Sequence, residues 1–400
     1  VKSNIQPRFG LSWQVLPMTV VRLGGGRFFQ RLGITDNVFT GGNAPFQPSA
    51  TVTNGLADTP GGTSGNSFPF NYSSQAYNYP SPEAYNWNLS IDQEFRGVGV
   101  FTLSYAGRRG IHEEELLNIN QLQPGTVQAN PTIKQPDALR PYKGFSNITQ
   151  ATNAGSSNYH SLQANLRRRM EHGFLFGLAY TWSKSMDYGS ANNVVLPNTY
   201  DRQIFYGVSD FDRRHVFVGN VVWNIPFFSH SNGFARAVLG GWQLSGIYQT
   251  QTGGPLNIST GSDYAGVGPG SGTQLFGHSS APSMNKGFAN QTGTAKWFNT
   301  AVYYQPAPGT FAPRGSRNTI YGPGFQSANA AMQKTWHVIP GHDNHTLIFR
   351  VEAFNFMNHP TPDNPNTNPT SGATNFGISR TKGGTYGADR QLQLSMRYAF

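Results

Sequence analysis

The last ten residues, QLQLSMRYAF at 391–400, constrain the fold more than any other stretch. Apolar and polar side chains alternate there, which is the period-2 pattern of a strand with two unlike faces. Soluble domains seldom end on a strand that presents one wholly apolar face, whereas a transmembrane β-strand needs about ten such residues. The apolar face carries Leu392, Leu394, Met396, Tyr398 and Phe400.

The rest of the chain repeats this design. Alternating stretches bounded by turn residues predict about eleven strands of the membrane-barrel kind. Their boundaries are expected to shift by a few residues. The predicted strands are Gln6–Gln14, Thr19–Arg27, Ala84–Phe95, Gly99–Ala106, Tyr159–Arg169, Phe174–Trp182, His215–Asn224, Trp242–Tyr248, Gln326–His337, Thr346–Asn358 and Gln391–Phe400.

The connections between these strands alternate between short and long. One rim with tight turns and one with long loops is typical of an outer-membrane barrel, with the turns periplasmic and the loops extracellular. The long loops are rich in Gly, Asn, Ser and Thr, which predicts mobility rather than a defined pocket. Within one of them, Glu113–Leu117 is a candidate short helical turn.

Composition supports an all-β membrane protein. Charged residues make up 12% of the chain, against a typical ~25% in globular proteins. There are 47 Gly, 26 Pro and no Cys, so thiol chemistry and disulfides are excluded. No run of 18 apolar residues occurs, so membrane insertion requires strands. The net charge of +10 is scattered along the chain, which argues against a nucleic-acid partner.

The strand count predicts a larger barrel. Single-chain bacterial barrels have an even number of strands, and an open sheet in lipid leaves edge groups unpaired at several kcal/mol each. Because neighbouring strands run in alternate directions and the short turns are periplasmic, we also expect the Gln391 strand to run towards the periplasmic rim, with Phe400 at its end. Either one further strand lies within 253–324, or residues 1–400 are the C-terminal part of one larger barrel domain, which is the leading hypothesis. The start at Val1, without Met or signal peptide, predicts a processed or truncated N-terminus.

The candidate sites have structural explanations. The densest polar cluster predicts charge neutralisation at the outer rim rather than catalysis. A metal site at His337, His342 and His345 lacks an acidic partner nearby in sequence. Arg168 and Lys334 fall on apolar faces near strand ends, where their side chains can reach the interface. Neither a catalytic residue nor a cofactor is predicted. The polar cluster is Asp210, Asp212, Arg213, Arg214 and His215.

Two further sets of residues are assigned by strand face. Charges on polar faces are predicted to face the barrel lumen, and tryptophans are predicted to form interfacial girdles. The lumen set is Arg167, Arg350 and Glu352. The girdle set is Trp87, Trp182, Trp223, Trp242 and Trp336.

Several stretches, distributed over nearly the whole chain, resemble Oar-like TonB-dependent receptors of the Gram-negative outer membrane. They include YNWNLSIDQEF at Tyr85, NYHSLQANLRRRMEHGF at Asn158, SDFDRRHVFVGN at Ser209, LGGWQLSGIYQTQTGGPL at Leu239 and FRVEAFNFMNHP at Phe349.

This resemblance implies a barrel of ~22 strands, preceded by a plug and a small regulatory-like domain that this sequence does not contain. It implies energised passage of a bulky, unidentified substrate, driven by the TonB complex through the plug. The terminal strand, with Tyr398 and Phe400, resembles the signal read by the barrel-assembly machinery. The expected surroundings are outer-membrane lipid.

Two alternatives remain open. One is a passive porin-like barrel of ten to twelve strands. The other is a soluble secreted β protein that binds carbohydrate through its aromatic side chains. Detergent dependence separates the soluble protein from the two barrels, and the upstream reading frame separates the receptor from the porin.

Overall fold

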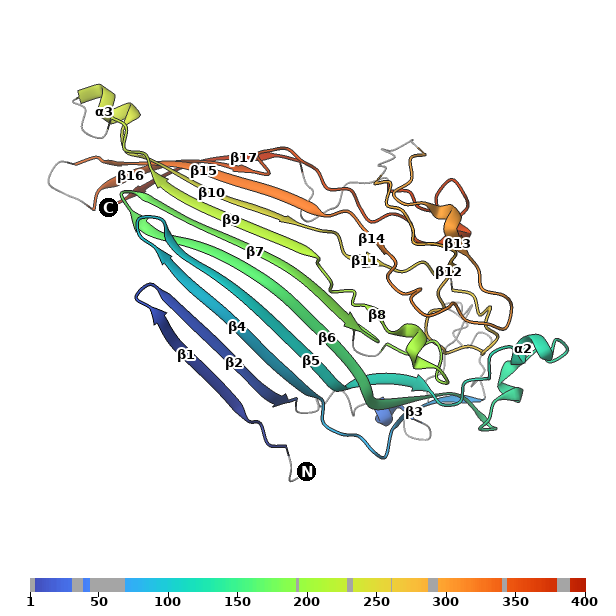
Figure 1. The fold of residues 1–400 in the computed structure, drawn as a ribbon. Coiled ribbons are helices and arrows are strands. Elements are labelled where there is room, and N and C mark those ends of the chain that lie inside the picture. The colour runs from blue at the N-terminus through green and yellow to red at the C-terminus, as the bar shows by residue number, and fades with distance from the viewer. Residues whose placement is uncertain are drawn as a thin grey trace.

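A computed structural model describes residues 4–30, 39–43, 69–191, 194–228, 233–259, 261–286, 294–339, 344–379 and 389–400. Its main element is one broad, curved antiparallel sheet (Figure 1). No helix among the described residues is long and apolar enough to cross a membrane.

The sheet has 13 strands, of which eleven follow one another along a single hydrogen-bonded path. Each of the eleven corresponds to a predicted strand. In path order they are β1 Arg8–Leu16, β2 Thr19–Phe29, β4 Glu83–Phe95, β5 Gly99–Asn118, β6 Phe145–Glu171, β7 Phe174–Asp187, β9 His215–Asn224, β10 Trp242–Gln251, β15 Phe325–His337, β16 Thr346–Phe354 and β17 Gln391–Ala399.

The remaining elements are short. β3 Phe70–Gln75 pairs in parallel with β6, and β8 Gly207–Val208 pairs with β7. Two small sheets join β11 Pro255–Leu256 to β14 Ile320–Tyr321, and β12 Gly277–His278 to β13 Tyr303–Tyr304. The helices are α2 Thr126–Ala129 and α3 Gly233–Leu239, with 3-10 turns at Phe39–Gly42, Pro136–Leu139, Arg202–Phe205, Thr300–Val302 and Pro369–Ser371.

The pairing register builds two unlike faces. Leu11 lies opposite Leu23, Leu23 opposite Leu89 and Leu89 opposite Tyr105, and the same apolar face continues to Leu394 on the last strand. We call this the outward face. The opposite, inner face carries Ser, Asn, Gln and charged residues. Because side chains alternate along each strand, a shift of one residue would exchange the two faces, so the burial requirement fixes the register.

The two ends of the sheet differ as the loop lengths predict. Short connections such as Arg96–Val98 lie at one end, here the turn rim, and long loops at the other, the loop rim (Figure 1). The C-terminus lies at the turn rim, which confirms the predicted direction of the last strand. Along the described path, β1 and β17 are the two end strands.

Two predictions about the loops are wrong. Glu113–Leu117 is not helical, since β5 continues through it to Asn118 with register shifts around Glu113. The described parts of the long loops also contain the main hydrophobic core and help to line a cleft, whereas the sequence predicts no defined pocket there. We call the described parts of 188–214, 252–324 and 355–379 the loop cap. Its clusters are Ile258, Tyr264, Phe276, Trp297, Phe298, Ile320 and Phe376, and Leu196, Phe205, Leu275 and Ala312.

Burial in the loop cap changes the chemistry of two phenols. Burial raises the pKa of Tyr303 to about 12, although a hydrogen bond with Thr319 partly opposes the shift. Burial also raises the pKa of Tyr264, whose hydroxyl donates to the Leu275 carbonyl at 2.5 Å. Both side chains therefore stay neutral at physiological pH and act as part of the apolar core.

Candidate functional site: a polar cleft at the loop rim

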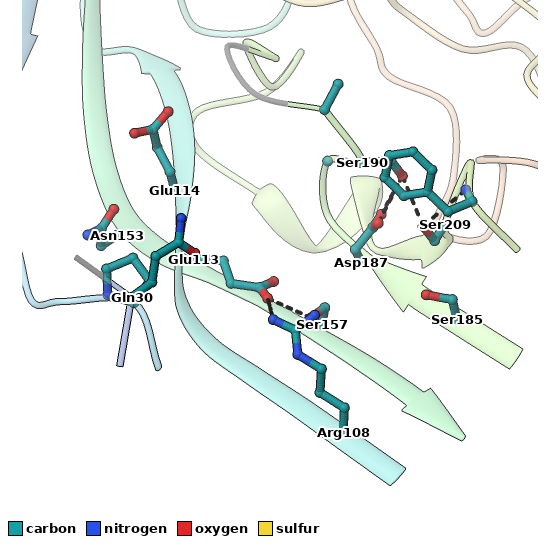
Figure 2. Close-up of a pocket in the computed structure, with 14 residues that line it drawn as sticks. Gln30, Arg108, Glu113, Glu114, Asn153, Ser157, Ser185, Asp187, Ser190 and Ser209 are labelled. Atoms are coloured by element: carbon teal, nitrogen blue, oxygen red, sulfur yellow. Dashed lines mark hydrogen bonds and ion pairs between the residues drawn. The ribbon is translucent and has the colours of Figure 1, made fainter. Parts of the chain in front are cut away.

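A polar cleft of about 280 Å³ lies where the inner face meets the loop rim (Figure 2). It opens between the outer ends of β5, β6 and β7 and the segments that follow β2 and β8. Its lining is hydrophilic except for Pro82, Ala191 and the exposed ring of Phe211. The other lining residues are Gln30, Arg108, Glu113, Glu114, Asn153, Ser157, Ser185, Asp187, Gly189, Ser190 and Ser209.

A β-bulge places the acidic side of the cleft. The β5–β6 register shifts on both sides of Glu113, and His112 before it has a φ of 56°. Bulges re-aim side chains that strict alternation would send to opposite faces. Glu113 consequently accepts a hydrogen bond from Ser157 at 2.7 Å and lies 3.6 Å from the Arg108 guanidinium. Glu114 accepts from the Tyr79 hydroxyl at 3.0 Å.

The opposite side of the cleft is organised by Asp187, at the end of β7. Ser190 donates to both of its carboxylate oxygens, at 3.0 and 2.8 Å, and its hydroxyl lies 3.2 Å from that of Ser209. Behind them, Arg317 donates to the Asp187 carboxylate and main-chain carbonyl, both at 2.7 Å. The Asp187 carboxylate on this side of the cleft is therefore paired with a buried cation.

Asn153 marks the floor of the cleft. Its side chain is 4% exposed, and its amide nitrogen donates to the Pro80 carbonyl at 2.6 Å. Its Oδ1 is buried and has no protein partner. The hydroxyl and carboxylate groups that line the cleft can bind hydrogen-bonding groups. No metal-ligating group of three His, Asp or Glu occurs within the described ranges.

The predicted polar cluster lies beside this cleft, but its strongest partners are distant in sequence. Asp212 is 1% exposed, and its carboxylate accepts a hydrogen bond from the Ser185 amide at 2.8 Å. The same carboxylate forms an ion pair with the Arg214 guanidinium at 3.5 Å. Asp210 accepts from Asn318 at 2.6 Å and lies 3.5 Å from Arg317. Arg213 donates to main-chain carbonyls, and His215 contacts Tyr180 instead.

Arg317 is the residue that sequence reasoning missed. It comes from the irregular 252–324 segment, where no periodicity distinguishes one arginine from another. Its side chain is nonetheless buried, with the guanidinium 5.4 Å from the centre of the Phe205 ring.

The predicted lumen residues lie on the inner face but apart from the cleft. Arg350 donates to Glu352 at 2.7 Å and to Gln333 at 3.4 Å, on β16 and β15. Arg167 lies near the turn rim on β6, opposite Gly177. These side chains place charge on the inner face of β6 and β16.

The five predicted girdle tryptophans all lie on the outward face, in two rows. Trp87 and Trp182 lie towards the loop rim, on β4 and β7. Trp223, Trp242 and Trp336 lie at the turn rim.

The remaining candidates lie at the turn rim. Arg168 lies 3.5 Å from Glu171 and over the Phe174 ring. His345 accepts or donates a 2.8 Å hydrogen bond with Tyr398, whose ring stacks on that of Phe400. His337 ends β15, and His342 lies outside the described residues.

A family model described as outer membrane beta barrel domain matches residues 1–393. The sequence has no match among curated proteins. The fold is similar to that of the outer membrane transporter YddB from Escherichia coli (12% identity, 99% of this chain and 41% of that chain, TM-score 0.49). It is also similar to that of the FrpB iron transporter from Neisseria meningitidis (F3-3 variant). The two share 11% identity, the match covers 99% of this chain and 39% of that chain, and the TM-score is 0.44.

A third similar structure is the ferripyoverdine receptor of the outer membrane of Pseudomonas aeruginosa (11% identity, 99% of this chain and 33% of that chain, TM-score 0.44). The chain therefore spans 33–41% of the length of these three structures.

Proposed function

Because the chain belongs to the outer membrane β-barrel domain family, whose model covers residues 1–393, we propose that it forms part of the barrel wall of a TonB-dependent receptor. The protein resides in the outer membrane, and its outward face lies against lipid. The receptor assignment, with energised passage of a bulky substrate, rests on the Oar-like sequence resemblance and on the architecture described above.

The observation that carries the proposal is that the two faces of the eleven-strand path differ in polarity. One face is apolar from β1 to β17, the other is polar, and the long loops fold into a cap with a polar cleft at its inner side. A bulky substrate entering from outside would meet the loop cap first and then the inner face. Energy enters such a receptor through a plug in the lumen, and we place the TonB contact on that plug.

The number of strands favours a large barrel over a small porin. Along the described path β1 and β17 are end strands, and all nine residues of β1 are exposed. Unpaired edges in hydrocarbon cost several kcal/mol per group, so we propose that further strands lie between β1 and β17 in the functional barrel. A wall of ~22 strands encloses a lumen wide enough for a plug.

The decisive experiment uses the protein expressed from its full reading frame in its own host. Photo-crosslinking groups placed along the lumen-facing plug should capture the inner-membrane TonB protein, and capture should stop when the proton-motive force is collapsed. The purified protein should show no steady conductance in a planar bilayer, because a plug closes the lumen. A stable open conductance without any TonB crosslink would instead support the passive porin.

A further inference from the structure

Among the described turn-rim connections, the one between β9 and β10 contains a helix. Between β9 and β10 the chain forms α3, Gly233–Leu239, which projects past the strand ends (Figure 1). Its side chains are strongly apolar and exposed, with Phe234 82% exposed to solvent. Val238 and Leu239 on α3 and Phe227 and Phe228 before it are also exposed, and we call these five residues the α3 wedge.

Side chains of the outward face hold the end of α3. The Trp336 indole donates to the Ala237 carbonyl at 2.7 Å, and the Trp242 indole donates to the Val238 carbonyl at 2.9 Å. Lys334 donates to the Arg236 carbonyl at 3.2 Å and also to the Gly240 carbonyl. The Ala237 and Val238 carbonyls at the end of α3 and the Gly240 carbonyl just beyond it thus acquire side-chain donors, while the Arg236 carbonyl accepts from both Lys334 and the Gly240 amide.

This arrangement explains why a lysine occurs in an apolar row. Lys334 lies opposite Trp242 on one side and Phe349 on the other, on the outward face. Its ammonium group is buried, 5.7 Å from the Trp242 ring centre and 5.4 Å from that of Trp336. A cation at a helix C-terminus also interacts favourably with the helix dipole. Lys334 is therefore a positioning residue for α3 rather than a misplaced surface charge.

We propose that the α3 wedge inserts into the boundary between head groups and acyl chains of the periplasmic lipid leaflet. The main argument is continuity, because the donors that hold α3 belong to the outward face, which lies against lipid. Phe, Leu and Val side chains gain from entering this boundary, and the nearby Arg236 can meet lipid phosphate groups. This inference concerns membrane anchoring and is independent of TonB energisation.

Residues 1–400 contain no cysteine, so a single labelling site can be introduced there once any cysteine elsewhere in the full reading frame is replaced by serine. A spin label at Phe234→Cys, in the full-length protein reconstituted into phosphatidylethanolamine and phosphatidylglycerol vesicles, reports depth through its relative accessibility to oxygen and to a nickel chelate. We expect high oxygen and low nickel accessibility at this position. Leu162→Cys on the outward face of β6 serves as the lipid reference, and Tyr142→Cys in an exposed loop serves as the aqueous reference.

A second measurement tests the positioning role of Lys334. In a Lys334→Met background the label at position 234 should become more mobile and move towards the aqueous reference, while the label at position 162 should not change. If Lys334→Met fails to assemble, the depth of the Phe234 label in the otherwise unaltered protein still decides the proposal. Nickel accessibility equal to that at position 142 would overturn it. A label that is aqueous in vesicles but protected in whole cells would also overturn it, and would assign the wedge to a protein partner.

Discussion

Arg317 joins three segments of the loop rim through one buried guanidinium group. It bonds to Asp187 at the end of β7, to Ser190 beyond it and to the Phe205 carbonyl. Removing one partner of a buried ion pair leaves an uncompensated charge, which costs about 3–5 kcal/mol. The same group also supports the Asp187 side of the polar cleft.

We predict that Arg317→Ala destabilises the loop cap by about 3–5 kcal/mol. Hydrogen exchange of the amides in 188–214 and 252–324 should accelerate accordingly. Arg314→Ala is the matched control, because its side chain is 65% exposed and pairs with Asp201 at 3.2 Å. An exposed pair contributes about 0–1 kcal/mol, so equal effects of the two substitutions would contradict the assigned role of Arg317.

Tyr303 gives the loop cap a defined response to alkaline pH. Its pKa in the folded cap is about 12, against about 10 in an unfolded chain. A raised pKa contributes stability that is fully present below pH 10 and is lost as the pH rises towards 12. Tyr303→Phe should remove this contribution to the loss of cap stability at alkaline pH. The substitution also removes the 2.8 Å hydrogen bond to Thr319. Hydrogen exchange of the cap between pH 9 and 11 would detect the difference, and an unchanged pH profile would refute it.

Single strands also differ in how far the sequence could predict them. The β4–β5 hairpin was predictable because its apolar and polar residues alternate and Gly97, with a φ of 71°, suits a tight turn. The outer half of β5 was not, because the bulge at Glu113 interrupts the alternation. The acidic run there imitates a helix, and the signal for a strand comes only from its pairing with β6.

The two faces of β5 provide a test of orientation. Leu103 lies on the outward face, five residues into β5 from the turn rim and so near the middle of the ~10 residues that cross the hydrocarbon, whereas Ser104 lies on the inner face between Ser90 and Gln163. An arginine on the lipid face of a barrel costs about 2–4 kcal/mol at the membrane midplane, and lumen substitutions cost little. Leu103→Arg should therefore lower the free energy of unfolding in urea by that amount in lipid vesicles, with Ser104→Arg close to the unaltered protein. Equal costs, or the reverse order, would show that the faces are assigned incorrectly.

At the scale of the whole molecule, the sheet and the loop cap are stabilised by different forces. The main sheet places its large apolar side chains on the outward face, against lipid, and is held together by main-chain hydrogen bonds between strands. The cap buries a water-excluded core instead. This core was not predictable, because Ile258, Phe298 and Phe376 are isolated in turn-rich sequence and meet only in three dimensions. Arg317 and the polar cleft were missed for the same reason.

This division predicts that the cap can unfold while the sheet remains assembled. Phe298 is fully buried and makes edge-to-face contacts with Tyr303 at 5.8 Å and Phe376 at 5.5 Å. Phe298→Ala should cost the cap about 3–5 kcal/mol, so that proteases cut within 252–324 in intact vesicles. The sheet should keep its resistance to unfolding by detergent on gel electrophoresis, because its strands share no core with Phe298. Phe356→Ala, at a side chain that is 45% exposed, is the matched control and should leave the cap resistant. Loss of the sheet together with the cap in Phe298→Ala would mean that the two fold as one cooperative unit, and the loops would then contribute to barrel assembly itself.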